Sequence, residues 1–241
     1  MTPLPSLYDV AVVIPTLNEE LHIADCLQSV IAQTFPFAKM DVMIVDGGSQ
    51  DHTTDIVQHL SAQYSNIRLL HNPKRIQSAA FNMAVEHSSA PYIIRLDAHA
   101  HYEAHYIELC LHHLRSSSKI GNVGGIWNIQ PSSSTLIART NALLNRSRFG
   151  IGGASFRVGT QSGETDTVPF GAFPRTLIQE IGGMNEQLAR GEDNEYNCRI
   201  HQAGYIVYLD TNIVSTYYSR PTFSSSIYQM YANGISIGQL I

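Results

Sequence analysis

Short apolar segments alternate with amphipathic segments through the first hundred residues of this 241-residue chain. The first of them, VAVVI at 10–14, is β-branched and continuously apolar, which is typical of a strand buried on both faces. The intervening segments carry apolar residues at helical spacing. This alternation predicts βαβ units, and therefore an α/β fold with a mostly parallel central sheet and helices on both faces. The expected strands span 10–14, 41–46, 67–70 and 92–97, and the expected helices span 21–31, part of 46–60, and 77–87.

The alternation becomes less regular after residue 127. A Ser-rich start predicts a helix within 131–150, and the Gly- and Ser-rich segment at 150–166 predicts a long loop. Such a loop is either a lid that orders over a bound ligand or a disordered surface segment. A further helix over 192–204 and a strand over 205–210 complete the expected elements.

The sequence contains no internal repeat and no obvious linker. We therefore expect a single domain over 1–220, followed by a helical segment over 221–241. The moderately apolar end of that segment fits either a natural terminus or a chain cut before a more hydrophobic region.

Composition excludes some classes of function. The net charge of −5 and the pI near 6.1 argue against nucleic-acid binding, which usually requires a basic patch. The three cysteines are far apart and form no C-x-x-C pair, which favours a reduced, cytoplasmic compartment. No apolar run of about 18 residues is present, so we expect no membrane-spanning helix within this sequence.

Polar and acidic residues follow each of the first four expected strands, at 15–19, 46–49, 71–75 and 97–99. Ligands of open parallel sheets bind at the carboxyl ends of the strands. The chain lacks both the P-loop and the G-x-G-x-x-G motif, which disfavours ATPases and dinucleotide-binding enzymes. An acidic site that binds an anionic ligand normally requires a divalent cation. Asn18 is also expected to cap the helix that follows the first strand.

The segment RLDAHAHYEAHY, 95–106, contains two candidate metal sites. Asp97 ends an expected strand, and an extended chain would point His99 the same way, giving an oxygen and an imidazole ligand for Mn²⁺ or Mg²⁺. Alternatively, Asp97 caps the next helix. His101 and His105 are spaced as in a zinc hydrolase, but Glu103 is displaced from its place in H-E-x-x-H. We therefore expect both histidines to lie on a partly exposed helix.

A second acidic cluster, RGEDNE, spans 190–195. Glu192 and Asp193 at the start of a helix would interact favourably with the helix dipole, which is one explanation for them. The alternative is that Asp193 is a general base, since an ionised carboxylate can accept the proton of an attacking hydroxyl.

Five motifs in order resemble the inverting family 2 glycosyltransferases of GT-A fold, most closely those of succinoglycan-type exopolysaccharide assembly. These motifs are VVIPTLNEE, IVDGGSQD, RIQSAAFNMAV, IIRLDAHAHY and GAFPR…IGGMNE…RGEDNEYNCRI, and they cover nearly the whole chain. The resemblance implies that Asp97 and His99 occupy the D-x-D metal position, with histidine as its third member. It also implies that Asp193 is the catalytic base, with Glu192 beside it. The residues that would bind the nucleotide are Pro15, Thr16, Asn18, Glu19, Asp46, Arg75 and Asp97.

The activity implied by this resemblance is metal-dependent transfer of a sugar, with inversion, from a nucleoside-diphosphate sugar. Uridine is the expected base, and a glycan or a lipid-linked oligosaccharide is the expected acceptor. The Q-x-x-R-W signature of processive synthases is absent, which favours the addition of one sugar per encounter. Family members often continue into membrane helices, which implies peripheral association with the inner face of the cell membrane. Two alternatives remain: a non-catalytic sugar-nucleotide or glycan-binding protein, and a sugar nucleotidyltransferase.

Overall fold

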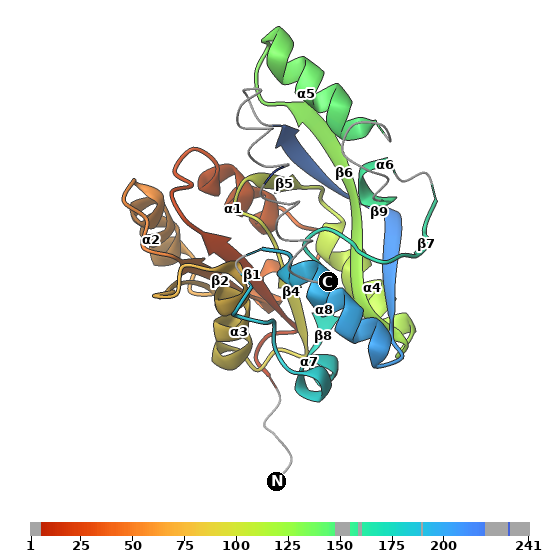
Figure 1. The fold of residues 1–241 in the computed structure, drawn as a ribbon. Helices are drawn as coiled ribbons and strands as arrows, with labels where there is room; N and C mark the ends of the chain where they lie inside the picture. Colours follow the sequence, from red (N-terminus) through yellow and green to blue (C-terminus); the bar gives the residue numbers. More distant parts are fainter. Residues whose placement is uncertain (1–5, 148–154, 159–160, 189, 220–230, 232–241) are drawn as a thin grey trace.

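The computed structural model describes residues 6–147, 155–158, 161–188, 190–219 and 231. Figure 1 shows these residues arranged around one twisted sheet, with the helix α5 projecting from one end. The expected helical segment over 221–241 lies outside the described residues, apart from Tyr231, as do parts of the expected loop over 150–166.

The first half of the chain builds the parallel part of the sheet. Its strands are β1 (Val10–Thr16), β2 (Met40–Asp46), β3 (Ile67–His71) and β4 (Tyr92–Arg95). They lie in the order β3-β2-β1-β4, and every pairing among them is parallel. The strands predicted from the four apolar runs are therefore confirmed, with ends shifted by at most two residues.

The second half of the chain extends the sheet beyond β4, in the order β8-β6-β9-β5, and here antiparallel pairings appear. β8 (Ala172–Pro174) is antiparallel to both β4 and β6 (Ile120–Pro131). β9 (Ile206–Ser219) is parallel to β6, while β5 (Ala100–Tyr102) and β7 (Gly163–Glu164) are antiparallel to β9.

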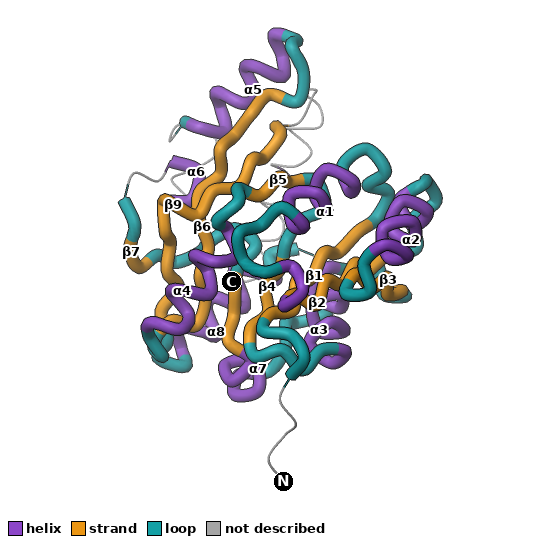
Figure 2. The backbone as a smooth tube through the Cα atoms, turned by 180° about the vertical axis from the view of Figure 1, so that it is seen from behind, coloured by secondary structure: helices purple, strands orange, loops and turns teal. Residues whose placement is uncertain are grey.

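Helices cover both faces of the sheet, as expected. One core contains side chains of α1 (Ile23–Ile31), α2 (Thr53–Gln63) and α4 (Tyr106–Ser116), and it also takes Val10, Val12 and Ile14 of β1. The other contains side chains of α3 (Gln77–His87), α7 (Arg175–Ile181) and α8 (Glu192–Gln202), together with Ala11 and Val13. Figure 2 shows the same layers from behind. Because alternate side chains of β1 enter opposite cores, its apolar run is continuous. The remaining elements are η1 (Phe37–Lys39), α5 (Leu136–Arg146) and α6 (Ser155–Val158).

Two local expectations are wrong. Asn18 does not cap α1, whose N-cap residue is His22; instead Asn18 has a φ of 57° and its side chain accepts a hydrogen bond from the Gln50 N–H. His101 does not lie on a helix, because residues 100–102 form β5, which pairs with β9 through Ala100 and Tyr217. His105 is the N-cap residue of α4 rather than a helical position.

The close approach of β6 and β9 predicts a strong effect at Gly125. A Cβ atom there would lie 1.7 Å from the carbonyl oxygen of Ile213, which belongs to backbone and cannot swing aside. We expect Gly125→Ala to lower the free energy of unfolding by about 3 kcal/mol or more, measured by urea denaturation. Asn128→Ala, at an exposed position of β6, is the control and should change it by less than about 0.5 kcal/mol. Equal stability of the two variants would contradict this packing.

Candidate active site

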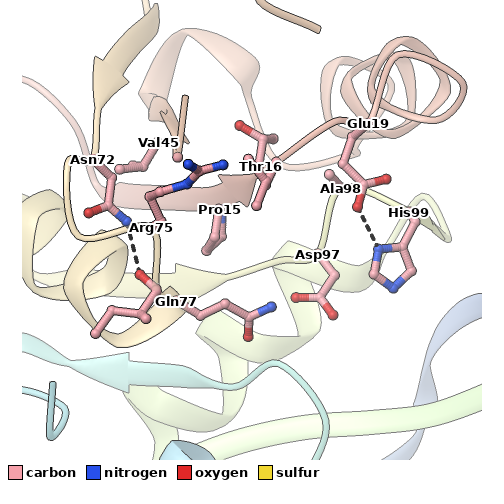
Figure 3. A pocket seen from close by; sticks show the side chains of 13 residues that line it. Pro15, Thr16, Glu19, Val45, Asn72, Arg75, Gln77, Asp97, Ala98 and His99 are labelled. Atoms are coloured by element: carbon pink, nitrogen blue, oxygen red, sulfur yellow. Dashed lines mark hydrogen bonds and ion pairs between the residues drawn. The ribbon is translucent and has the colours of Figure 1, made fainter. Parts of the chain in front are cut away.

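A pocket opens at the carboxyl ends of β1, β2 and β4, where the sheet topology places the ligand sites of such folds. Figure 3 shows two chemically different sides. Arg75 and Gln77 lie on one side, while Asp97, Glu19 and His99 lie on the other. The lining residues of the pocket include Pro15, Thr16, Glu19, Val45, Gly47, Asn72, Arg75, Gln77, Asp97, Ala98 and His99.

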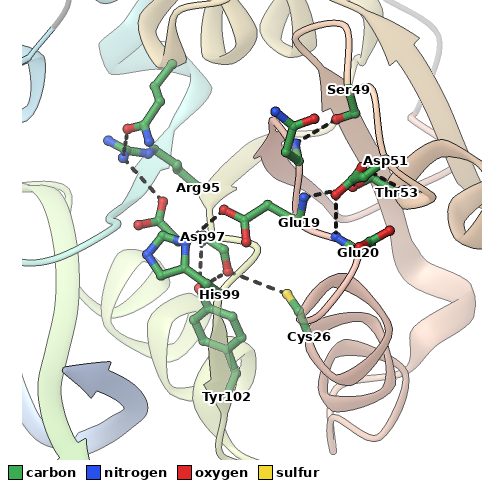
Figure 4. A network of polar contacts seen from close by, with 12 residues as sticks. Glu19, Glu20, Cys26, Ser49, Asp51, Thr53, Arg95, Asp97, His99 and Tyr102 are labelled. Atoms are coloured by element: carbon green, nitrogen blue, oxygen red, sulfur yellow. Dashed lines mark hydrogen bonds and ion pairs between the residues drawn. The ribbon is translucent and has the colours of Figure 1, made fainter. Parts of the chain in front are cut away.

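The acidic side of the pocket is built on Asp97. The buried hydroxyl of Tyr102 accepts a hydrogen bond from the Asp97 N–H at 2.7 Å and donates one to the Asp97 carbonyl oxygen at 3.1 Å. The thiol of Cys26 on α1 lies 3.5 Å from the same carbonyl oxygen (Figure 4). These contacts fix the backbone of Asp97 and leave its carboxylate directed into the pocket (Figure 3). Asp97 does not cap a helix, since α4 begins at Tyr106.

His99 shares the pocket with Asp97, as the sequence predicted, and also contacts Glu19. The Nδ1 atom of His99 lies 3.2 Å from Oε1 of Glu19. The ring of His99 also meets the ring of Tyr217 on β9, with 6.4 Å between their centroids. The pocket therefore brings together two carboxylates and one imidazole from the β1–α1 and β4–β5 loops.

Arg95 is a functional candidate that the sequence analysis missed. It lies on β4 with a side chain only 7% exposed, and it forms ion pairs with Glu192 at 3.2 Å and with Asp97 at 3.4 Å. Its guanidinium also donates to the side-chain oxygen of Gln77. Arg95 therefore connects the carboxylate of the pocket to the acidic start of α8. A single charged residue inside the apolar run YIIRL was the available signal.

The charges in this cluster depend on one another. Burial opposes the charge of Arg95, but the carboxylates of Asp97, Glu192 and Asp193 outweigh burial and raise the pKa of Arg95 above its ordinary value. Burial also raises the pKa of Glu192, an effect that Arg95 opposes. The Glu192 side chain, which is 8% exposed, is therefore a buried partner of Arg95.

Asp193 is the more accessible member of the acidic pair. Its side chain accepts a hydrogen bond from the Asn194 N–H at 2.8 Å, and α8 has Gly191 as its N-cap residue. Asp193 borders a small hollow with Asn122 and Phe170, separate from the pocket around Asp97. Its charge nevertheless acts on Arg95, so both predicted carboxylates of α8 belong to the same electrostatic cluster as Asp97.

Two of the predicted nucleotide-binding residues do not line the pocket. Both oxygens of the buried Asp46 carboxylate accept hydrogen bonds, from the N–H groups of Gly48 and Ser49 and from the Ser49 hydroxyl. The side-chain oxygen of Asn18 accepts a hydrogen bond from the Gln50 N–H, and the Asn18 N–H donates one to the Ser49 hydroxyl. The Asn18 contacts join the β1–α1 loop to the β2–α2 loop. The contacts of Glu19 and Glu20 with residues 51–53 join the same two loops (Figure 4).

Three residues with strained backbone conformations lie in or near this site. Among the described residues, three that are not glycine have positive φ: Asn18 at 57°, Arg75 at 60° and Phe170 at 66°. Arg75 lines the pocket, and Asn18 hydrogen-bonds the β2–α2 loop beside it. Phe170 packs against the ring of Tyr102, whose hydroxyl hydrogen-bonds the backbone of Asp97. Each such conformation costs about 1–3 kcal/mol and persists where the surrounding structure enforces it, often at binding sites.

The histidines do not form a zinc site. His101 contacts Asp25 of α1, while His105 contacts Glu108 of α4. Within the described ranges, no group of three or more His, Cys, Asp and Glu residues could by itself hold a metal ion. The donor set at Asp97 and His99 still suits a Mg²⁺ or Mn²⁺ ion, because such ions are commonly held by one or two protein ligands together with phosphate oxygens of the substrate.

The fold and the acidic pocket define a glycosyltransferase domain of GT-A type. Residues 11–182 match the model of glycosyl transferase family 2, and the chain belongs to this family.

Curated relatives agree with this assignment. The chain is 30% identical over 240 residues to the dolichyl N-acetyl-alpha-D-glucosaminyl phosphate 3-beta-D-2,3-diacetamido-2,3-dideoxy-beta-D-glucuronosyltransferase of Methanococcus voltae, covering 96% of this chain and 74% of the relative. It is 29% identical over 225 residues to the succinoglycan biosynthesis protein ExoA of Rhizobium meliloti, covering 92% and 67%.

Solved structures show the same fold. S. aureus TarS in complex with UDP superposes with a TM-score of 0.67 at 15% identity, over 92% of this chain and 63% of TarS. The mannosyltransferase PcManGT of Pyrobaculum calidifontis, in complex with GDP-Man and Mn²⁺, gives a TM-score of 0.69 at 20% identity, over 94% and 64%. The chain thus spans slightly less than two thirds of these solved chains. Within its described part, no helix is both long and apolar enough to cross a membrane.

The buried pairing of Arg95 predicts a large stability effect. We expect Arg95→Met to lower the free energy of unfolding by about 3–5 kcal/mol, because Glu192 and Asp97 lose their partner. Arg95→Met combined with Glu192→Met should recover much of this loss in chemical denaturation. Arg115→Met is the matched control, since Arg115 is 48% exposed and 3.7 Å from Asp9, and should cost less than about 1 kcal/mol. A double variant no more stable than Arg95→Met would contradict the pairing.

Proposed function

We propose that this chain transfers a sugar from a nucleoside-diphosphate sugar to a glycan or lipid-linked acceptor, with inversion and with the help of a divalent cation. The observation that carries the proposal is the Asp97–Arg95–Glu192 network. It joins a carboxylate in the pocket to the start of α8, where Asp193 lies. This network supports the proposal because it links Asp97, the proposed metal ligand, to the helix that carries Asp193, the proposed base.

The pocket suits the donor because its two sides have opposite character. Arg75 provides a cation for the phosphates or the base, while Pro15 and Thr16 form the floor between Arg75 and Asp97 (Figure 3). Asp97 and His99 would hold a Mn²⁺ or Mg²⁺ ion. When bound, this ion neutralises the charge that develops on the departing diphosphate. UDP and GDP-Man are bound by the structural neighbours TarS and PcManGT, and uridine remains our proposal for the base here.

Asp193 is proposed as the general base. Its carboxylate accepts the proton of the acceptor hydroxyl as that oxygen attacks the anomeric carbon. The attack comes from the face opposite the nucleoside diphosphate, so the configuration is inverted in a single displacement. Arg95 and Glu192 keep the start of α8 in place and do not touch the substrate. The absence of a Gly-rich phosphate loop after β1 argues against a nucleotidyltransferase reaction.

The acceptor is proposed to be lipid-linked. The Methanococcus relative is named for a dolichyl-linked sugar phosphate, and the Rhizobium relative is named for succinoglycan biosynthesis. Both names describe glycan assembly, and we propose the same kind of pathway for this chain, at the inner face of the cell membrane.

The proposed metal site includes His99 but not His101, and this difference can be tested. Thermal unfolding with UDP or GDP and Mn²⁺ should show stabilisation that depends on both components. We expect Asp97→Asn to abolish the Mn²⁺-dependent part and His99→Ala to reduce it. His101→Ala is the matched control, because His101 lies two residues on and pairs with Asp25 away from the pocket, and it should keep the full shift. Loss of the shift in His101→Ala but not in Asp97→Asn would refute the assignment.

The proposed role of Asp193 as general base can be tested by measuring the rate of sugar transfer. Asp193→Asn keeps the shape of the side chain but cannot accept a proton, so we expect transfer to fall by about 10²–10⁴-fold. Binding of the nucleoside diphosphate should remain as in the wild type. Asp25→Asn is the control, an exposed carboxylate on α1 outside the pocket, and should retain activity. Undiminished transfer by Asp193→Asn would remove this residue from the mechanism, and wild-type protein that binds donor without any turnover would indicate a non-catalytic binding protein.

A further inference from the structure

The helix α5 presents its apolar side chains to solvent. Leu136 is 80% exposed, Ile137 50%, Leu143 66% and Leu144 40%. At 100° per residue these four positions fall within an arc of about 120°, which also contains the exposed Thr140, so they lie on one largely apolar side of the helix. We call Leu136, Ile137, Leu143 and Leu144 the outer face of α5.

The opposite side of α5 packs on the sheet with small and polar residues: Ala138, Asn141, Ala142 and Asn145. This is the reverse of an ordinary surface helix, whose apolar stripe faces the core. Ala142 joins a small cluster with Ile129 of β6 and Tyr217 of β9. Contiguous apolar side chains that point outward often mark a surface that binds a partner or a membrane.

The charged residues in the part of the sequence that contains α5 are all positive. The sequence between Glu108 and Glu164 contains six of the 15 Lys and Arg residues and none of the 20 Asp and Glu residues, although the net charge of the chain is −5. Arg139 and Arg146 are exposed on α5 itself, and Arg157 of α6 lies over the ring of Trp127 at 4.9 Å. Among the described residues, none of these three arginines forms an ion pair with a carboxylate.

α5 also lies close to the candidate active site. Its Ala142 packs with Tyr217, and the ring of Tyr217 meets the ring of His99. The helix stands at the end of β6, projecting from the body of the molecule (Figures 1 and 2). The helix α5 and the Tyr217 ring therefore lie between the outer face and the pocket.

We propose that the outer face of α5 inserts into the interfacial region of an anionic lipid bilayer, with Arg139 and Arg146 against the headgroups. A helix with leucines on one side and only basic charges beside them is suited to lie in such an interface. A symmetric pairing of α5 with α5 of a second copy would bring the arginines of the two helices near each other, although Arg146 also donates to the Ile129 carbonyl oxygen, and this disfavours a dimer. The proposal assigns a surface, and it does not depend on Asp193 or on the nature of the sugar.

The test is sedimentation of the 241-residue chain with vesicles. We expect binding to phosphatidylcholine vesicles containing phosphatidylglycerol, weaker binding to phosphatidylcholine alone, and loss of binding in high salt. Leu136→Gln combined with Leu143→Gln should reduce the partition coefficient at least about tenfold. The matched control replaces Leu7 and Leu21 by Gln, since these leucines are 75% and 83% exposed elsewhere on the surface, and it should bind as the wild type does.

A second measurement locates the contact. Leu143→Trp adds one tryptophan to the single native Trp127, and brominated lipids in the vesicles should quench the added fluorescence. Leu7→Trp should show no such additional quenching. The proposal is overturned if the wild type does not bind anionic vesicles or if both leucine double variants bind equally. It is also overturned if the α5 variant changes the mass of the protein in solution from a dimer to a monomer, since a second copy would then cover the face. Retained Mn²⁺-dependent nucleotide binding in the α5 variant separates this outcome from a failure of the proposed function.

Discussion

The candidate site depends on one buried charge, the guanidinium of Arg95 inside the sheet. A buried cation is costly unless carboxylates surround it, and here Asp97 of the β4–β5 loop and Glu192 of α8 provide them. Separating Arg95 from either carboxylate would leave a buried charge without a partner. The ion pairs therefore fix the position of the first turn of α8 relative to the carboxyl end of β4. The fold thereby positions Asp97 and Asp193 without requiring them to touch.

The surroundings of Asp97 are also tightly held. The buried Tyr102 hydroxyl bonds both the N–H and the carbonyl oxygen of Asp97, and the loops after β1 and β2 are fastened by their own polar side chains. A preorganised pocket of this kind loses little freedom when a ligand binds. The acidic pocket contrasts with α5, whose charged side chains, Arg139 and Arg146, are both basic.

The parallel part of the sheet could be predicted from the sequence because its signals are local. A continuous apolar run such as 10–14 indicates a doubly buried strand without knowledge of its neighbours. The errors involve contacts between distant segments. Asn18 looked like a helix cap but binds Gln50 of another loop, and His101 looked helical but lies on β5, which pairs with β9 more than a hundred residues later. The Arg95–Glu192 pair could not be predicted for the same reason, since 97 residues separate its members.

The most direct test of the account is a crystal structure of the protein soaked with Mn²⁺ and a nucleoside diphosphate, with the metal located by anomalous scattering. We expect a single strong peak bonded to the Asp97 carboxylate and to the diphosphate, in the pocket between Arg75 and His99. A metal found instead at His101 or His105, or a diphosphate bound away from the carboxyl ends of β1 and β4, would contradict it.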